Sequence, residues 1–266
     1  ELHCHSHFSL LDGASSPADL VARAAALGMT ALALTDHDAV YGAPAFVRAA
    51  RAAEVRPILG AELTLHDESH LTLLAADATG WANLCALITA ARHNAEKGAA
   101  RLPRGGLEGH TEGLIAFSGC RQGVVASALL RRDRPGALKA AQALLHLFGH
   151  YRLWIELQHH LLPADAWLVS ESVALAEHLG VGYLATNNVH YATSDRRCLG
   201  DVLVAIRHNT TLDECRHLRS NSEFYLKSGL ELAPLFARYP DALHNTQHVA
   251  GQCDFTLEYG LQELPA

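Results

Sequence analysis

The chain has 266 residues, of which 49% are hydrophobic and 18% are charged, and its formal net charge is −7. This composition is typical of a globular chain that buries a core, and the negative charge argues against a dedicated binder of duplex DNA, whose surface is usually basic. We find no apolar run long enough to span a bilayer and no charged-then-apolar leader, so we expect no membrane partner.

The chain opens with ELHCHSHFSLLDG, in which His3, His5 and His7 alternate. Alternate residues of a β-strand point to the same face, so a strand here would project His3 and His5 together, as half of a metal site requires. A helix is predicted next, over SSPADLVARAAALGM, because Ser16 and Asp19 have the spacing of a capping box.

The alternation of strand and helix continues to about residue 194. Strands are predicted at TALALTDHD, RPILGAEL, HLTLLAA, GLIAFSGC, YRLWIELQ and VGYLATNNVHY, with helices at APAFVRAARAAEV, GWANLCALITAARHN, 121–148 and 163–179. With the opening segment these make seven strands, and strands that alternate with helices are typical of parallel pairing. An open doubly wound sheet and a closed barrel both fit this order.

Polar residues at the predicted strand ends favour the barrel. They are the TDHD segment, Glu62, Cys120, and Asn188 with His190. In a parallel β/α barrel the chemistry gathers at the carboxyl ends of the strands, whereas an open sheet concentrates it at one switch point. We therefore predict an α/β fold with a seven-stranded (β/α)-type barrel over residues 1–194. Residues 195–266 are predicted as a helical extension with one short strand at EFYLK.

Eight side chains of the metal-ligand type fall at or near the predicted strand ends: His3, His5, Asp12, His37, Glu62, His70, Cys120 and His190. A single histidine after a strand is more often capped or solvated, and a single cysteine is most often a small buried hydrophobe. Together, however, imidazole, carboxylate and thiolate groups indicate borderline cations such as Zn²⁺, Fe²⁺ or Mn²⁺. Eight ligands exceed one tetrahedral site, so we expect two or three divalent ions.

The segments HCHSHFSLLDG, ALTDHDAVYG, GAEL with HLTLLA, SGC and ATNNVHY resemble the successive motifs of the polymerase and histidinol phosphatase (PHP) family. The resemblance implies a distorted seven-stranded barrel with a trinuclear metal cluster. It places the metal ligands on the eight residues above and on Asn188, and it leaves His7 as a rim residue. The family motif normally reads Asn-Asp-Val-His, so Asn188 replaces a carboxylate, and we expect one ion to bind weakly or to be absent.

The C-terminal segments DVLVAIRHNTTL, EFYLKSGLELAPLF and PDALHNTQHVAGQC resemble the region that leads to the palm in bacterial C-family DNA polymerases. That family includes the replicative alpha subunit and an error-prone relative, and the opening segment resembles the error-prone branch most. The resemblance implies a domain of a longer, cytoplasmic polymerase, whose partners are the rest of that chain and a DNA 3′ end. The scattered cysteines also suit a reducing cytoplasm, and the chain does not begin with Met.

A cation cluster at the strand ends would lower the pKa of a shared water and stabilise charge on a phosphate, which is the chemistry of phosphoester hydrolysis. In a polymerase this predicts a 3′–5′ exonuclease. Two alternatives stay open: a silent scaffold within the polymerase, and a stand-alone phosphatase of the histidinol phosphatase kind, against which the C-terminal segments argue.

Charged residues near the predicted ligands have two alternative roles each. Asp36 and Asp38 flank His37, and we expect them to orient it or to shuttle a proton, or equally to cap a helix. Arg92, Arg121 and the pair Arg196–Arg197 could bind phosphate, but we assign them to the solvated surface.

Overall fold

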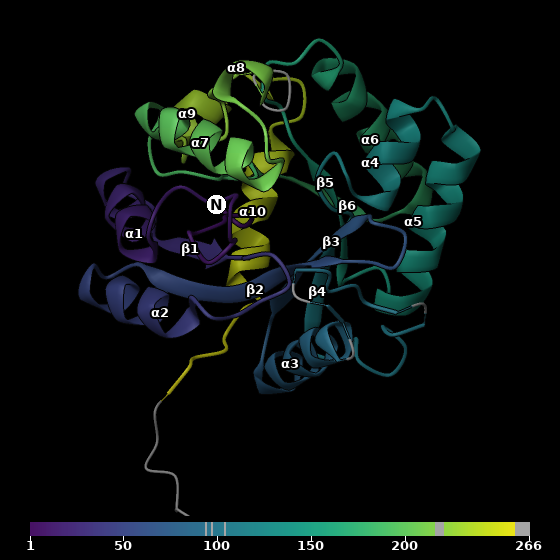
Figure 1. Cartoon of the computed structure of the whole chain (residues 1–266). Helices are drawn as coiled ribbons and strands as arrows, with labels where there is room; N and C mark the ends of the chain where they lie inside the picture. Colours follow the sequence, from purple (N-terminus) through teal and green to yellow (C-terminus); the bar gives the residue numbers. More distant parts are fainter. Residues whose placement is uncertain (94, 97, 104, 216–220, 259–266) are drawn as a thin grey trace, which may run out of the picture.

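The computed structural model describes residues 1–266 apart from 94, 97, 104, 216–220 and 259–266. A six-stranded sheet in the order β1-β2-β3-β4-β5-β6 curls through the middle of the molecule, with helices around its outer side (Figure 1). The strands are β1 (Ala31–Leu34), β2 (Arg56–Thr64), β3 (His70–Ala75), β4 (Leu114–Phe117), β5 (Leu153–Leu157) and β6 (Gly182–Ala185).

Helices alternate with the strands and then dominate the C-terminal part. They are α1 (Pro17–Ala26), α2 (Ala43–Ala52), α3 (Ala78–Arg92), α4 (Val124–Leu130), α5 (Arg134–Phe148), α6 (Asp165–Leu179), η1 (Ser194–Arg196), α7 (Arg197–Arg207), α8 (Leu212–Cys215), α9 (Gly229–Leu232) and α10 (Asp241–Gly251). The predicted capping box begins α1, because Ser16 Oγ accepts from the Asp19 N–H and the Asp19 carboxylate accepts from the Ser16 N–H, both at 3.1 Å. Among the described helices, none has the length and apolar character needed to cross a membrane.

The prediction of parallel pairing throughout is wrong at β3. This strand runs antiparallel to both β2 and β4, while the other neighbouring strands pair in parallel. Only residues 65–69 separate β2 from β3, and a link this short returns as a hairpin because a parallel crossover needs a dozen residues or so. The reversal brings His70, at the amino end of β3, to the edge where the other strands have their carboxyl ends.

The opening segment, predicted as a seventh strand, is not a strand of this sheet. Cys4 forms an isolated bridge with Val189. The segment is nevertheless bonded on two sides, because the Thr35 N–H donates to Cys4 O at 2.8 Å and the Val189 N–H donates to His3 O at 2.9 Å. It lies between the end of β1 and the residues after β6, and the chain turns away from residue 7, before a longer ladder can form. The strand predicted at EFYLK is likewise an isolated bridge, at Tyr225.

The apolar core fills both faces of the curled sheet. On the outer face, α1 and α2 pack against β1 and β2, and α3 to α6 pack against the remaining strands. On the inner face, single side chains from successive strands, such as Ile58, Leu74 and Leu184, meet Val249 of α10. The inside of the curl is therefore apolar next to α10, and the polar residues gather at the strand ends.

Candidate metal centre

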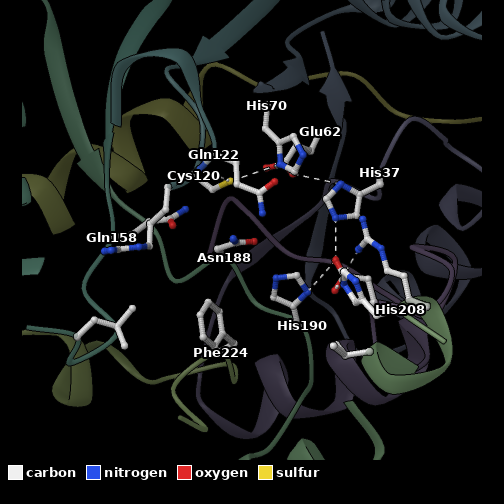
Figure 2. A pocket seen from close by; sticks show the side chains of 15 residues that line it. His37, Glu62, His70, Cys120, Gln122, Gln158, Asn188, His190, His208 and Phe224 are labelled. Atoms are coloured by element: carbon white, nitrogen blue, oxygen red, sulfur yellow. Dashed lines mark hydrogen bonds and ion pairs between the residues drawn. The ribbon is translucent and has the colours of Figure 1, made fainter. Parts of the chain in front are cut away.

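The nine predicted ligands come from neighbouring strand ends. His3, His5 and Asp12 belong to the opening segment and its turn, Glu62 to β2, His70 to β3, and His37, Cys120, Asn188 and His190 to the stretches after β1, β4 and β6. Seven of them line one pocket of about 610 Å³ (Figure 2), and His3 and His5 are fully buried. The sheet thus brings together side chains that are up to 187 positions apart in the numbering, from residue 3 to residue 190.

Glu62 is the central carboxylate of this group, with 1% of its surface exposed. Its Oε1 lies 2.6 Å from His70 Nδ1 and 3.1 Å from His37 Nδ1, and its Oε2 lies 2.8 Å from His3 Nε2. Within the described residues, neither oxygen meets a donor at ordinary hydrogen-bond angles. Three imidazoles that converge on one buried carboxylate without such angles suit a ligand shared by two cations.

Asp12 forms a second meeting point. Its Oδ2 lies 2.8 Å from His37 Nε2 and 3.4 Å from His190 Nδ1. The His5 ring stacks between these two imidazoles, with ring centres 4.3 Å from His37 and 4.8 Å from His190. His5 Nε2 is 3.1 Å from His3 Nε2. His37 therefore contacts both carboxylates, one with each ring nitrogen, and links the two halves of the cluster.

The donor set fits divalent cations. Two triads, His3–His5–Glu62 and His37–Glu62–His70, each have ligand atoms within 4.8 Å of one another. Both triads contain Glu62, so this carboxylate is placed to bridge two ions. Imidazole and carboxylate ligands together suit Zn²⁺, Fe²⁺ or Mn²⁺ better than Mg²⁺.

The buried carboxylates favour positive charge on the histidines that contact them. Burial lowers the pKa of His3, but Glu156 and Glu62 outweigh it and raise this pKa to about 10. Burial also acts against the proton on His37, yet the two carboxylates that it contacts raise its pKa to about 10. Burial disfavours the charge of Glu62, but His70 and His3 hold its pKa well below the ordinary value. Bound cations would replace these protons.

Two other predicted ligands, His5 and Cys120, are electrically neutral. Burial and the neighbouring imidazoles of His37 and His190 lower the pKa of His5 well below its ordinary value, so its ring is ready to act as a ligand. Burial raises the pKa of the Cys120 thiol well above its usual range, and its Sγ lies 3.4 Å from His70 Nδ1. This thiol becomes a ligand only when a cation displaces its proton.

Asn188 lies between the Cys120 side of the pocket and His190 (Figure 2). Its Oδ1 is buried and, among the described residues, has no hydrogen-bond partner. Its backbone is in the left-handed region, with φ +41°, which asparagine tolerates better than most residues. A buried amide oxygen without a partner can accept a cation, but it brings no negative charge, so this position fits a weak ligand.

Asp36 and Asp38 use their carboxylates to fix the backbone. Asp36 accepts from the Ser6 N–H at 2.7 Å and from the Ser9 hydroxyl at 2.7 Å, and that hydroxyl oxygen lies 3.0 Å from His5 Nδ1. Asp38 accepts from the N–H and the hydroxyl of Thr64, both at 2.8 Å. Asp36 thus orients His5 through Ser9, whereas its predicted action on His37 stays a prediction.

His7 is exposed and lies in a separate surface hollow.

Glu156 is part of the site, although sequence reasoning missed it. It lies in β5, is 5% exposed, and its Oε1 is 2.6 Å from His3 Nδ1. Gln158 Nε2 donates to the same oxygen at 2.9 Å, and the Thr186 hydroxyl also donates to it. A carboxylate that holds the far nitrogen of a ligand histidine fixes its ring and tautomer. The available sequence signal was a lone acid in the otherwise apolar run LWIEL.

The other wall of the pocket is built from different parts of the chain. Its lining residues are Arg121, Gln122, Gln158, Leu162, Val204, Arg207, His208 and Phe224. Val204 and Arg207 belong to α7, and His208 follows it directly, so the C-terminal segment contributes to the pocket. Arg207 NH1 is 4.0 Å from Asp12 Oδ1.

Fold and site together define an α/β protein with a curled sheet and a cluster of metal-ligand side chains at its strand ends. The chain belongs to the PHP domain family, whose model matches residues 1–160.

The chain is also similar to longer proteins. An error-prone DNA polymerase from Symbiobacterium thermophilum is 40% identical over an alignment of 272 positions, gaps included, which covers 95% of this chain and 25% of the polymerase. A DNA polymerase III subunit alpha from Treponema pallidum is 35% identical over an alignment of 268 positions, gaps included, which covers 95% of this chain and 23% of that subunit. The chain therefore spans about a quarter of the length of these relatives. A solved amidohydrolase from Chromobacterium violaceum is 19% identical, with a TM-score of 0.46, over 73% of this chain and 88% of its own.

Proposed function

We propose that this chain is the metal-dependent phosphoesterase domain of a bacterial DNA polymerase of the alpha or error-prone type, and that it removes nucleotides from a DNA 3′ end. The observation that carries the proposal is Glu62, which lies between His3, His37 and His70 in the wall of a pocket of about 610 Å³. Polymerase relatives that are four times as long support the rest of a polymerase chain and DNA as its partners.

The proposed centre would hold two or three divalent ions, and Glu62 would be the ligand common to the two triads. When bound, such ions neutralise charge on a phosphate and lower the pKa of a water molecule. The chain's own residues prepare this site. Ser9 and Asp36 turn the neutral His5 ring so that its Nε2 faces the cluster. Glu156 fixes His3 from the opposite nitrogen.

A silent scaffold is the second candidate function, and Asn188 is the observation that favours it. The neutral amide stands where the family motif has a carboxylate, so the third ion would lose one charged ligand. A chain that binds only this ion weakly would keep the His3–His5–Glu62 triad and would still bind metal there. Metal binding and hydrolysis therefore have to be measured separately.

The deciding experiment is a nuclease assay on 3′-labelled single-stranded DNA with Mn²⁺ or Zn²⁺, a chelator control, and the variants His5→Ala and Asn188→Asp. We expect release of mononucleotides that the chelator abolishes and that His5→Ala lowers by at least about 100-fold, since even the loss of a residue behind a metal ligand costs up to that much. His7→Ala is the matched control, because His7 is an exposed histidine of the same segment.

Activity in Asn188→Asp alone would identify a nearly complete centre that is disabled at one ligand. Bound metal without hydrolysis in either form would contradict the exonuclease and support the scaffold.

A further inference from the structure

Arg121 is held in the pocket wall by a buried carboxylate. It follows Cys120 directly, and its NH1 donates to Asp165 Oδ1 at 2.5 Å. The side chain of Asp165 is 1% exposed, whereas that of Arg121 remains 29% exposed. One edge of the guanidinium is thus fixed inside the protein. A guanidinium has five N–H donors in a planar fork, so the bond through NH1 leaves donors for an anion in the pocket.

Asp165 has other donors besides Arg121. Its Oδ2 accepts from the backbone N–H groups of His160 at 2.7 Å and Leu162 at 3.0 Å. A buried ion pair costs desolvation and is weak support for stability. The pair therefore has a clearer role in holding the guanidinium in one place than in stabilising the fold.

The turn that carries Cys120 and Arg121 is rigid. Gly119 has φ +89°, and a Cβ there would lie 2.3 Å from His70 O. The Gly123 N–H donates to Cys120 O at 2.7 Å, and a Cβ on Gly123 would lie 2.3 Å from Ser118 O. The turn is packed tightly against the start of β3, so the backbone of Arg121 is held beside the ligand cluster, and the bond to Asp165 holds its guanidinium.

We propose that Arg121 binds a non-bridging oxygen of the phosphate that is undergoing hydrolysis, with Asp165 as the residue that positions it. The proposal rests on the phosphoesterase function and deepens it, because it names the side chain that binds the reacting phosphate and the residue that positions this side chain. It replaces the assignment of Arg121 to the solvated surface.

The test compares Arg121→Gln and Arg121→Lys with the native chain in the presence of Mn²⁺. The substrates are bis(p-nitrophenyl) phosphate, which carries a single phosphate, and 3′-labelled single-stranded DNA. We expect kcat/KM of Arg121→Gln to fall by about 10- to 100-fold on both substrates, the range for the loss of hydrogen bonds to a charged group. Arg121→Lys should recover part of the loss, because it keeps the charge and not the fork.

Arg134→Gln is the matched control, since Arg134 also pairs with a carboxylate at 2.5 Å but is 69% exposed and lies at the start of α5. It should leave both substrates unaffected. Metal content and the unfolding temperature are measured for every variant. If Arg121→Gln has a lower unfolding temperature than the native chain, the kcat/KM of Arg121→Lys is used instead. A kcat/KM equal to that of the native chain on both substrates would then contradict the proposal.

A second readout separates this proposal from the proposed function. Binding of an oligonucleotide with 3′ phosphorothioate linkages is followed by fluorescence anisotropy with Ca²⁺ in place of Mn²⁺. We expect Kd to rise about tenfold in Arg121→Gln, the equivalent of one charged hydrogen bond.

Unchanged Kd and unchanged kcat/KM in an active chain would overturn the role of Arg121 alone. A loss on DNA without a loss on bis(p-nitrophenyl) phosphate would also overturn it, because the contact would then be to a neighbouring phosphate. If the native chain binds metal and hydrolyses neither substrate, the exonuclease proposal fails, while the Kd comparison still decides Arg121.

Discussion

Two fully or almost fully buried histidines near the strand ends, His3 and His160, have opposite electrostatic surroundings. His3 lies between Glu62 and Glu156, which raise its pKa to about 10 against the effect of burial. His160 is bonded to the backbone oxygen of Asn187 at 2.9 Å and stacks on Phe224 with ring centres 4.0 Å apart. Burial, with the nearby charge of Lys227, lowers the pKa of His160 to about 4.

The comparison teaches that burial alone does not identify a metal ligand. Both rings are removed from water, yet carboxylates surround one and a peptide carbonyl holds the other. A carboxylate-rich pocket favours any cation, whether a proton or a metal ion. Around His160, burial and the charge of Lys227 favour a neutral ring, and they outweigh the hydrogen bond to the Asn187 carbonyl, which acts in the opposite direction. Nearby carboxylates therefore distinguish His3 from His160, whereas His5 is neutral like His160 and is distinguished by its position among the other predicted ligands.

On the carboxylate-rich side of this comparison, the variant Glu62→Gln should have the largest effect on metal affinity and hydrolysis. It removes the carboxylate that three imidazoles share, so we expect metal affinity and hydrolysis to fall by more than about 100-fold, beyond the loss caused by removing a residue behind a ligand. Metal per chain is measured by mass spectrometry after dialysis, and hydrolysis is measured on the same samples. Glu68→Gln is the control, because Glu68 is an exposed carboxylate paired with Arg101. Full metal content in Glu62→Gln would contradict the proposed centre.

Glu156→Gln should have a smaller effect on the same side of the comparison. His3 would lose the carboxylate at its far nitrogen, and such a loss usually costs about 10- to 100-fold in metal affinity. The measurement is a competition titration of Zn²⁺ with a chromophoric chelator at constant pH. Glu171→Gln, which removes the carboxylate partner of the exposed Arg134, should leave the affinity unchanged. If Glu156→Gln binds Zn²⁺ as tightly as the native chain, Glu156 does not support His3 as a ligand.

The strand and helix order was largely predictable because local patterns determine it. Hydrophobic runs and the Ser16–Asp19 capping box are features of neighbouring residues, and so is the alternation that places His3 and His5 on one face. The direction of β3 was not predictable from alternation alone. The decisive feature there was the short link 65–69, and the general preference of alternating elements for parallel pairing outweighed it.

The remaining contacts of the site depend on residues far apart in the chain. No local pattern near Glu156 predicts its contact with His3, which is 153 positions away. A lone acid in an apolar strand also occurs at exposed edges. Arg121 and Asp165 are 44 positions apart and belong to different elements. Their pairing depends on how α6 packs beside the turn after β4, which no local pattern specifies.

The smallest expected effect concerns His160 and tests the neutral side of the comparison. Its pKa in the folded chain, about 4, lies below the ordinary value of 6.5, so the unfolded chain takes up a proton first as the pH falls. Its contribution to stability is therefore present above pH 6.5 and is lost as the pH falls toward 4, whereas the contribution of His3 is complete below pH 6.5 and is lost as the pH rises through about 10.

In His160→Gln, which keeps a side-chain donor for the Asn187 oxygen, this dependence should disappear. Between pH 6.5 and 5, the free energy of unfolding of the native chain should fall by about 1.5 kcal/mol more than that of the variant. Urea unfolding in the presence of a chelator measures both, and His178→Gln, at an exposed position of α6, controls for the loss of one histidine.

Equal slopes of unfolding free energy against pH in the native chain and in His160→Gln would mean that His160 takes up its proton in the folded state as an ordinary histidine does. The contrast with His3 would then rest on its carboxylates alone, since burial with a carbonyl partner would have no effect of its own on the charge of the ring.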